Sequence, residues 1–419
     1  MDIKIYKSET RGHVAIPASK SLLHRALICA SLAKGKSIIR NIYLNDDVNA
    51  TIDCLRNLGA KVIVNDDIIE VFGIKKFEKV NNPLNVNASA STLRFLLGIC
   101  TLFKNKILIE GQKRVFQRNN EAIVPIFKKN QCEIILNENN IEIIGEIKSG
   151  EYIIDGSMSS QFISGLLFLF PLLKGNSKLT VKEPFVSQGY VDMTIQVMKE
   201  FNIKIKKDNN VFYIDGNQEY IPCDYVCEGD YSQLSFFSSL ALLNGNIICE
   251  NINKESIQPD RKLIDILKES NCEFTSLTNG YVFNKSFYKL PEIDITNNPD
   301  LGPILMILSL FSCNETKIMG INRLINKESN RKEVMINILL KCGALIEEYE
   351  DYIIVKPRKL NISGKFDSFN DHRILMSLVV LGTMSDDYIA VQNIECVKKS
   401  YPTFFDDIKK VNVKYEFID

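Results

Sequence analysis

Long apolar runs recur along the chain at nearly constant spacing, and each follows a small or acidic polar residue. Successive runs begin 70, 68, 73, 70 and 71 residues apart. Ser and Asp commonly cap helix N-termini, and each run has the length of a buried helix. One run, over 162–173, contains a glycine and a proline and is too short to cross a bilayer. The polar residues that open the six runs are Ser19, Ser89, Ser157, Asp230, Asp300 and Asp371.

A second pattern lies between these runs. Six amphipathic segments each end just before a short β-like segment, at intervals of 72, 71, 69, 72 and 69 residues. Five of the six end residues are Gly or Asn, which tolerate the left-handed conformation of a helix C-terminus. The end residues are Gly59, Gln131, Asn202, Asn271, Gly343 and Asn412.

Two independent patterns with one period of about 70 residues indicate six internal repeats. Each repeat is expected to contain a strand, a buried helix, a strand, an amphipathic helix and further strand. Ordinary α/β alternation is the alternative, but it does not explain why both patterns share a period. We therefore predict an α/β protein of two domains with three repeats each, covering 15–228 and 229–419. The N-terminal strand, residues 1–14, is assigned to the second domain.

Composition narrows the function. Lys plus Arg and Asp plus Glu both number 51, so a general nucleic-acid or anionic-membrane surface is not expected. The 11 cysteines are scattered without a CxxC pair, which argues against zinc and favours a reducing cytoplasm. The N-terminus has no hydrophobic signal core.

Basic residues gather at the predicted helix starts. Helix N-termini attract anions, and cations beside apolar helices are costly unless they are paired. In a chain of zero net charge, ten such residues indicate a small polyanionic substrate. Hydroxyls of Ser21, Ser159, Ser160 and Ser187 could bind its sugar-like or phosphate oxygens. The ten are Lys20, Arg25, Arg94, Arg114, Arg118, Lys327, Arg331, His372, Arg373 and Lys399.

Two carboxylates lie among these cations. Asp300 and Glu328 could transfer protons, since the cations keep carboxylates ionised while desolvation raises their pKa. Two structural alternatives remain open: Asp300 as an N-cap, and Glu328 as an ion-pair partner of Arg331. For Asp230 we favour a role as a cap alone. His13 and His24 lack the spacing of metal ligands, and no phosphate-binding loop or nucleophile elbow occurs.

Several motifs resemble the 5-enolpyruvylshikimate-3-phosphate synthase family over nearly the whole chain. This resemblance implies two domains of three βαβαββ units each, with pseudo-threefold symmetry and an active site in the cleft between them. It also implies transfer of the enolpyruvyl group of phosphoenolpyruvate to the 5-hydroxyl of shikimate 3-phosphate, on the pathway to chorismate and aromatic amino acids. Neither a metal nor an organic cofactor is expected. The protein is expected to be a monomer. The motifs are PASKSLLHRAL, NASASTLRFLLG, KRVFQRN, DGSMSSQF, NNPDLGP, KESNRKEV, SFNDHRILM and CVKKSYPTFF.

The resemblance also implies roles for individual residues. Asp300 would accept the proton of the 5-hydroxyl, and Lys20 or Glu328 would help to protonate the enol carbon. Shikimate 3-phosphate would be bound by Lys20, Ser21, Arg25, Ser159, Ser160, Gln161, Ser187, Tyr190, Asp300, Arg323 and Lys327. Phosphoenolpyruvate would be bound by Lys20, Ala90, Arg118, Gln161, Arg331, Arg373 and Lys399.

The chain departs from the family pattern at three positions. Ala90 replaces the usual Gly, Asn119 follows Arg118 where Pro is usual, and KESNR replaces KESDR. In this family glyphosate occupies the phosphoenolpyruvate position, so the extra methyl of Ala90 predicts reduced sensitivity to it.

Two rival functions remain open. One is enolpyruvyl transfer to UDP-N-acetylglucosamine, although the loop 112–120 lacks that family's cysteine. The other is a non-catalytic anion-binding scaffold, which would explain the cations but not the two carboxylates beside them.

Overall fold

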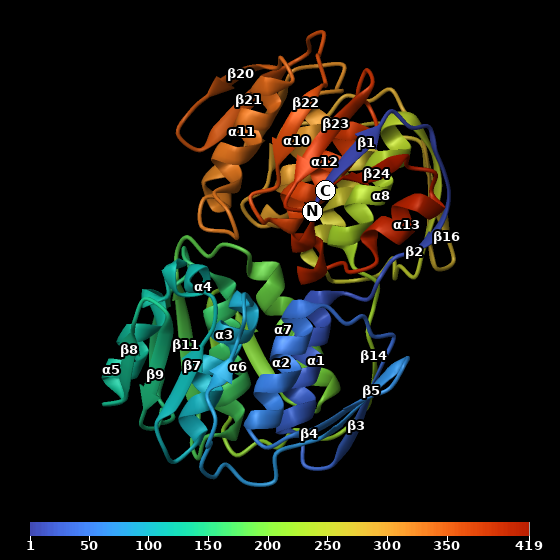
Figure 1. Ribbon diagram of the computed structural model, residues 1–419. Coiled ribbons are helices and arrows are strands. Elements are labelled where there is room, and N and C mark those ends of the chain that lie inside the picture. The colour runs from blue at the N-terminus through green and yellow to red at the C-terminus, as the bar shows by residue number, and fades with distance from the viewer. Residues whose placement is uncertain (419) are drawn as a thin grey trace. The chain divides into compact units, whose positions relative to one another are not determined.

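The computed structural model describes residues 1–418, which form two compact units. The unit that we call N-terminal consists of Ala18–Cys227. The C-terminal unit consists of Met1–Pro17 together with residues 228–418. Figure 1 shows that each unit places its sheets around a group of central helices. None of the helices in residues 1–418 has the length and hydropathy that a membrane crossing requires.

The N-terminal unit contains three repeats with the predicted order of elements. The first repeat comprises α1 (Lys20–Leu32), β3 (Lys36–Arg40), α2 (Asp46–Asn57), β4 (Lys61–Val64) and β5 (Ile68–Phe72). The second comprises β6 (Leu84–Asn85), α3 (Ala90–Ile99), β7 (Ile107–Glu110), α4 (Lys113–Gln117), α5 (Val124–Lys129), β8 (Glu133–Leu136) and β9 (Asn140–Ile144). The third comprises β10 (Glu151–Asp155), α6 (Ser160–Leu169), β11 (Ser177–Lys182), α7 (Gln188–Glu200), β12 (Ile205–Asp208), β13 (Val211–Ile214) and then β14 (Asp224–Val226).

The C-terminal unit repeats the same order. Its first repeat comprises α8 (Tyr231–Asn244), β15 (Gly245–Glu250), α9 (Lys262–Glu269), β16 (Phe274–Leu277) and β17 (Gly280–Asn284). Its second comprises β18 (Ile293–Asp294), α10 (Gly302–Ser309), β19 (Thr316–Met319), α11 (Arg331–Lys341), β20 (Leu345–Glu348) and β21 (Tyr352–Lys356). Its third comprises β22 (Gly364–Asp367), α12 (His372–Gly382), β23 (Tyr388–Gln392), α13 (Phe404–Lys410) and β24 (Tyr415–Ile418).

Every repeat has one four-stranded sheet of the same topology. In the sheet β6-β7-β9-β8, the first two strands are parallel and the hairpin strands are antiparallel. The parallel pair needs a helical crossover, which the buried helix supplies. The six sheets therefore confirm the predicted fold class of βαβαββ repeats.

Three strands complete sheets of repeats that lie far away in the sequence. β14 pairs in parallel with β3, and β2 (Thr10–Ala15) pairs in parallel with β15. β1 (Asp2–Tyr6) lies between β23 and β24, antiparallel to both. The two ends of the chain therefore meet in one sheet of the C-terminal unit (Figure 1).

Central helices α1, α3 and α6 are buried along most of their length, which confirms the apolar run over 162–173 as a buried helix. Two glycines bring α3 and α6 together. A Cβ at Gly165 would lie 2.5 Å from the carbonyl oxygen of Arg94, and one at Gly98 would lie 3.0 Å from that of Gly165. This close approach fixes the starts of both helices relative to each other.

All six predicted helix ends have a positive φ. The values are 102° at Gly59, 56° at Gln131, 65° at Asn202, 58° at Asn271, 84° at Gly343 and 66° at Asn412. Gln131 adopts the left-handed conformation although its side chain is not one that favours it.

Candidate active site

In the N-terminal unit, three central helices begin at serine caps. The side chains of Ser19, Ser89 and Ser159 accept hydrogen bonds from backbone N–H groups in the first turns of α1, α3 and α6. The third cap is Ser159 and not Ser157, which opened the motif in the sequence. Each cap leaves the remaining N–H groups of its helix start for an anion.

Lys20 is the first residue of α1 and pairs with a carboxylate that sequence reasoning missed. Its Nζ lies 2.7 Å from Oδ2 of Asp47, which is buried in the first turn of α2. The available signal was an acid on the buried face of an amphipathic helix. The pair holds Lys20 at the helix start.

Arg25 is buried without a carboxylate partner among residues 1–418. Its guanidinium donates to Thr194 Oγ1 at 2.8 Å, to the Ser21 carbonyl at 2.7 Å and to the Tyr190 carbonyl at 3.0 Å. Its remaining face lies over the Phe95 ring, 5.0 Å from the centroid. Burial lowers the pKa of Arg25 to about 10, so the residue still carries its charge at neutral pH.

Arg94 connects three segments that the sequence marked separately. Its Nη1 donates to Gln161 Oε1 at 3.1 Å and to Ser159 Oγ at 3.3 Å, and its Nη2 donates to the Arg118 carbonyl at 3.1 Å. Gln161 in turn donates to Ser91 Oγ at 2.8 Å. Sequence reasoning counted Arg94 as a cation for the substrate, whereas these contacts give it a positioning role as well.

In the C-terminal unit, one carboxylate lies among three cations. Asp300 Oδ1 is 3.3 Å from Lys327 Nζ and 3.2 Å from Arg331 Nη1, and Oδ2 is 3.0 Å from Arg373 Nη2. The Asp300 side chain is 27% exposed. Burial alone would raise its pKa, but the charges of Arg373, Lys327 and Arg331 hold the pKa well below the usual carboxyl range.

Asp300 is not a helix cap. It lies inside the 3-10 turn Pro299–Leu301 that leads into α10, and its side chain makes no capping hydrogen bond. The structural alternative for this residue is therefore wrong. Asp230, by contrast, accepts hydrogen bonds from Ser232 N and Gln233 N at the start of α8, which confirms its interpretation as a cap.

Arg331 is fully buried and ion-paired with several acids. It contacts Glu328 Oε2 at 2.7 Å, which is the predicted i,i+3 pair, and Asp371 Oδ2 at 2.7 Å. Asp371 also caps α12 through the backbone N–H of Arg373. Burial raises the pKa of Asp371, but Arg331 outweighs it and the pKa is lowered. The ion-pair role of Asp371 was not foreseen from its cap position.

Comparison with known proteins identifies the family of this chain. A family model described as EPSP synthase (3-phosphoshikimate 1-carboxyvinyltransferase) matches residues 6–408. The chain belongs to the EPSP synthase family. A 3-phosphoshikimate 1-carboxyvinyltransferase of Clostridium beijerinckii is 36% identical over 98% of this chain and 97% of its own length. One from Clostridium perfringens (strain ATCC 13124) is 37% identical, with 97% of each chain covered.

A solved structure agrees on the fold. An EPSP synthase from Acinetobacter baumannii superposes with a TM-score of 0.83 and covers 99% of both chains, at 22% sequence identity. Family membership confirms the predicted transferase activity on phosphoenolpyruvate and shikimate 3-phosphate. It also shows that the acceptor is shikimate 3-phosphate and not UDP-N-acetylglucosamine.

We call Lys20, Arg25, Arg94 and Gln161 the N-terminal cluster, and Asp300, Lys327, Glu328, Arg331, Asp371 and Arg373 the C-terminal cluster. The other residues predicted from EPSP synthase motifs differ in their surroundings. Ser187 precedes α7 in a left-handed conformation with φ 55°, and Tyr190 is half-buried on α7. Ala90 and Ser160 are buried first residues of α3 and α6. Lys399 is buried at the end of the 3-10 turn Ile394–Lys399.

Two further arginines differ in their surroundings. Arg118 is buried after α4 and presents its carbonyl to Arg94. Arg323 lies in the turn Ile321–Leu324; burial lowers its pKa, and the nearby charge of Asp351 opposes that effect. Among residues 1–418, no group of three or more His, Cys, Asp and Glu side chains could hold a metal ion. His24 bonds to Thr51 in the core.

Proposed function

We propose that enolpyruvyl transfer in this protein is performed by the two clusters described above, with Asp300 as the base. The observation that carries this assignment is the contact of Asp300 with Lys327, Arg331 and Arg373. These cations are the residues expected to bind the substrates, which supports a role of the nearby carboxylate toward the reacting hydroxyl. A carboxylate within reach of that hydroxyl can accept its proton.

Substrate binding changes the strength of this base. Three cations lower the pKa of Asp300 against the opposing effect of burial, which makes Asp300 ionised but weakly basic. An anionic phosphate or carboxylate that binds these cations offsets their charge. The pKa of Asp300 then rises, and the residue becomes a better base when both substrates are present.

The reaction follows in two steps. Asp300 takes the proton of the 5-hydroxyl as the hydroxyl oxygen attacks C2 of phosphoenolpyruvate, and Lys20 or Glu328 protonates its methylene carbon. The resulting tetrahedral ketal then loses phosphate, and the residue that protonated the carbon takes back one methyl proton, which gives the enol ether. Buried cations stabilise the charge that develops on the departing phosphate.

Binding of shikimate 3-phosphate is assigned chiefly to the N-terminal unit. Within residues 1–418 no carboxylate offsets the charge of Arg25, and Ser159 and Gln161 lie at the start of α6. The other proposed contacts in this unit are Lys20, Ser21, Ser160, Ser187 and Tyr190, with Arg323 and Lys327 from the C-terminal unit. Phosphoenolpyruvate is assigned to Lys20, the Ala90 backbone, Arg118, Gln161, Arg331, Arg373 and Lys399.

A coupled phosphate-release assay tests this function. Purified protein with phosphoenolpyruvate and shikimate 3-phosphate should release phosphate, and release should require both substrates. UDP-N-acetylglucosamine in place of shikimate 3-phosphate is the matched control and should give none. Binding of both substrates without release would favour the anion-binding scaffold instead.

The thiols support a proposal for the cellular setting. The 11 cysteines form no disulfide within residues 1–418, although several lie in one core. We assign the protein to the reducing cytoplasm on this ground and expect it to act as a monomer. Sedimentation velocity with and without both substrates tests the second expectation.

A further inference from the structure

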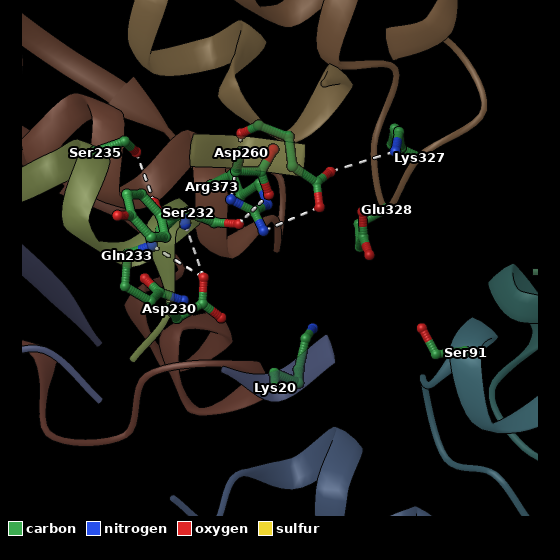
Figure 2. A network of polar contacts seen from close by, with 12 residues as sticks. Lys20, Ser91, Asp230, Ser232, Gln233, Ser235, Asp260, Lys327, Glu328 and Arg373 are labelled. Atoms are coloured by element: carbon green, nitrogen blue, oxygen red, sulfur yellow. Dashed lines mark hydrogen bonds and ion pairs between the residues drawn. The ribbon is translucent and has the colours of Figure 1, made fainter. Parts of the chain in front are cut away.

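A buried carboxyl group that the proposed reaction does not use lies beside Arg373 (Figure 2). Asp260 belongs to the 3-10 turn Pro259–Arg261 before α9 and is 4% exposed. Its Oδ2 accepts a 2.6 Å hydrogen bond from Ser232 Oγ, in the first turn of α8. Burial lowers the pKa of Arg373, whereas the charges of Asp300, Asp260 and Asp230 raise it.

The fold holds Asp260 at this place from two sides. Asn298 Nδ2 donates to the Pro259 carbonyl at 2.5 Å, which ties the turn of Asp260 to the segment that carries Asp300. Ser232 is fixed by its own backbone N–H, which donates to Asp230 Oδ1 at 2.8 Å. Segments from three separate parts of the C-terminal unit thus converge on one carboxyl group.

We propose that Asp260 is a positioning residue for Arg373, a second counter-charge that remains when Asp300 takes up the substrate proton. This inference rests on the proposed function, in which Arg373 binds phosphoenolpyruvate. Arg373 is buried, and its ion-pair partner is Asp300 at 3.0 Å. When Asp300 is protonated that pair is lost, and a buried cation without a counter-charge is costly. Asp260 supplies the charge that keeps Arg373 in place.

The charge of Asp260 changes between pH 5 and pH 8, where turnover can be measured. The pKa of Asp260 is raised by burial and by the charges of Asp300 and Asp230. It is lowered by the charge of Arg373 and by the hydrogen bond from Ser232. The resulting pKa is about 6. Asp260 is therefore ionised at pH 8 and largely neutral at pH 5. Wild-type protein at low pH should then behave as if its counter-charge had been removed.

The test compares turnover of wild type and Asp260→Asn from pH 5 to 8.5. Asn keeps the size of the side chain and an oxygen that accepts from Ser232 but has no charge. We expect wild type to be about tenfold faster at pH 8, the equivalent of one pKa unit. The ratio should fall to near one at pH 5. A ratio that is constant across pH, whatever its size, would overturn the proposal.

Two further variants sharpen the result. Ser232→Ala removes a bond that favours the ionised form, so the pH at which turnover changes should move upward. Asp265→Asn neutralises an acid on α9 whose ion pair is with Lys262, and its turnover ratio should stay near one. An effect of Asp265→Asn equal to that of Asp260→Asn would also contradict the proposal.

A titration of the wild-type protein separates this inference from the proposed function. Carboxyl ¹³C NMR of the unliganded chain should show an aspartate with a pKa near 6 that is absent in Asp260→Asn. Phosphoenolpyruvate should raise this pKa, since it offsets the charge of Arg373. An ordinary pKa, or no response to phosphoenolpyruvate, overturns the inference. Failure of wild type to release phosphate overturns the proposed function instead.

Discussion

Arg25 in the N-terminal unit and Arg331 in the C-terminal unit are both buried, yet their partners differ in charge. Arg25 donates to a hydroxyl and two carbonyl oxygens, whereas Arg331 contacts carboxylates, with Glu328 and Asp371 both at 2.7 Å. Arg94 follows the pattern of Arg25, with amide, hydroxyl and carbonyl acceptors. Lys20 differs from these two arginines because it pairs with the carboxylate of Asp47.

This difference separates two tasks. A cation held by neutral oxygens keeps its full charge for an incoming phosphate, at the cost of burying a charge that no acid offsets. A cation within a carboxylate network is already neutralised, so an incoming anion must compete and thereby changes the basicity of the acids. In the proposed function, the N-terminal cluster would therefore serve substrate binding, and the C-terminal cluster would combine phosphoenolpyruvate binding with proton transfer.

The largest expected effect comes from removing the central acid of the C-terminal cluster. Asp300→Asn should lower turnover by about 10²–10⁴-fold, the usual contribution of a general base. Phosphate release per folded molecule is the measurement. Asp294→Asn, whose side chain bonds the Thr296 N–H, is a matched control in the same repeat. Unchanged turnover in Asp300→Asn would assign proton transfer elsewhere.

Breaking the carboxylate network should cost stability. Arg331→Met leaves Asp371 fully buried without its main partner, which typically costs about 3–5 kcal/mol in unfolding free energy. Urea unfolding measures the loss. If Arg331→Met unfolds at the same urea concentration as wild type, the network does not stabilise the C-terminal unit.

The same substitution of Arg by Met in the N-terminal cluster should affect substrate affinity more than stability. Arg25→Met removes a buried charge with no acid partner, so unfolding free energy should change little or rise. Affinity for shikimate 3-phosphate should fall about 10- to 150-fold, the value of a charge-assisted contact of about 1.5–3 kcal/mol. Isothermal calorimetry provides the affinity. Equal losses of stability in Arg25→Met and Arg331→Met would remove the contrast between the clusters.

Replacing Ala90 tests whether a ligand approaches the backbone at the start of α3. Its methyl lies at the buried first position of α3, where glycine would let a ligand approach the backbone. Relief of overpacking is worth about 1–3 kcal/mol, so Ala90→Gly should strengthen glyphosate inhibition roughly ten- to hundredfold. The KM for phosphoenolpyruvate is the control and should change less. Identical inhibition constants would show that Ala90 does not set the response.

The smallest expected effect is a difference in pH dependence between two acids. The pKa of Asp300 is lowered, so its ionised form stabilises the fold above the ordinary carboxyl range, and this is lost as pH falls. The pKa of Asp260 is raised to about 6, so its stabilisation is full below pH 4 and is lost as pH rises through 6.

At pH 8, the two neutral variants should therefore change the free energy of unfolding in opposite directions. Asp300→Asn should lower the free energy of unfolding by about 1 kcal/mol, and Asp260→Asn should raise it by a similar amount. When thermal unfolding is followed by circular dichroism, the Asp260→Asn difference should shrink toward pH 4, whereas the Asp300→Asn difference should persist at pH 4 and shrink only at lower pH. The same sign for both variants at pH 8 would contradict the assigned charges.

Features that depend on neighbouring residues were predictable from the sequence. Four of the six predicted helix caps, the apolar runs and the left-handed helix ends are set within one or two turns of the chain; the caps at Ser157 and Asp300 were wrong. They repeat every 70 residues or so, which fixed the number of repeats and the α/β class. The motifs then led to the family, and the predicted cap role of Asp230 was correct for the same local reason.

Only the tertiary structure decided the partners of the charged groups. Arg331 and Asp371 are 40 residues apart and Lys20 and Asp47 are 27 apart, so no local pattern joins them. The sequence left two roles for Asp300, helix cap or functional acid, and the three cation contacts in the structure favour the second. Ion pairs form where folding brings distant side chains together, and burial, which sets their strength, belongs to the whole unit and not to any segment of its sequence.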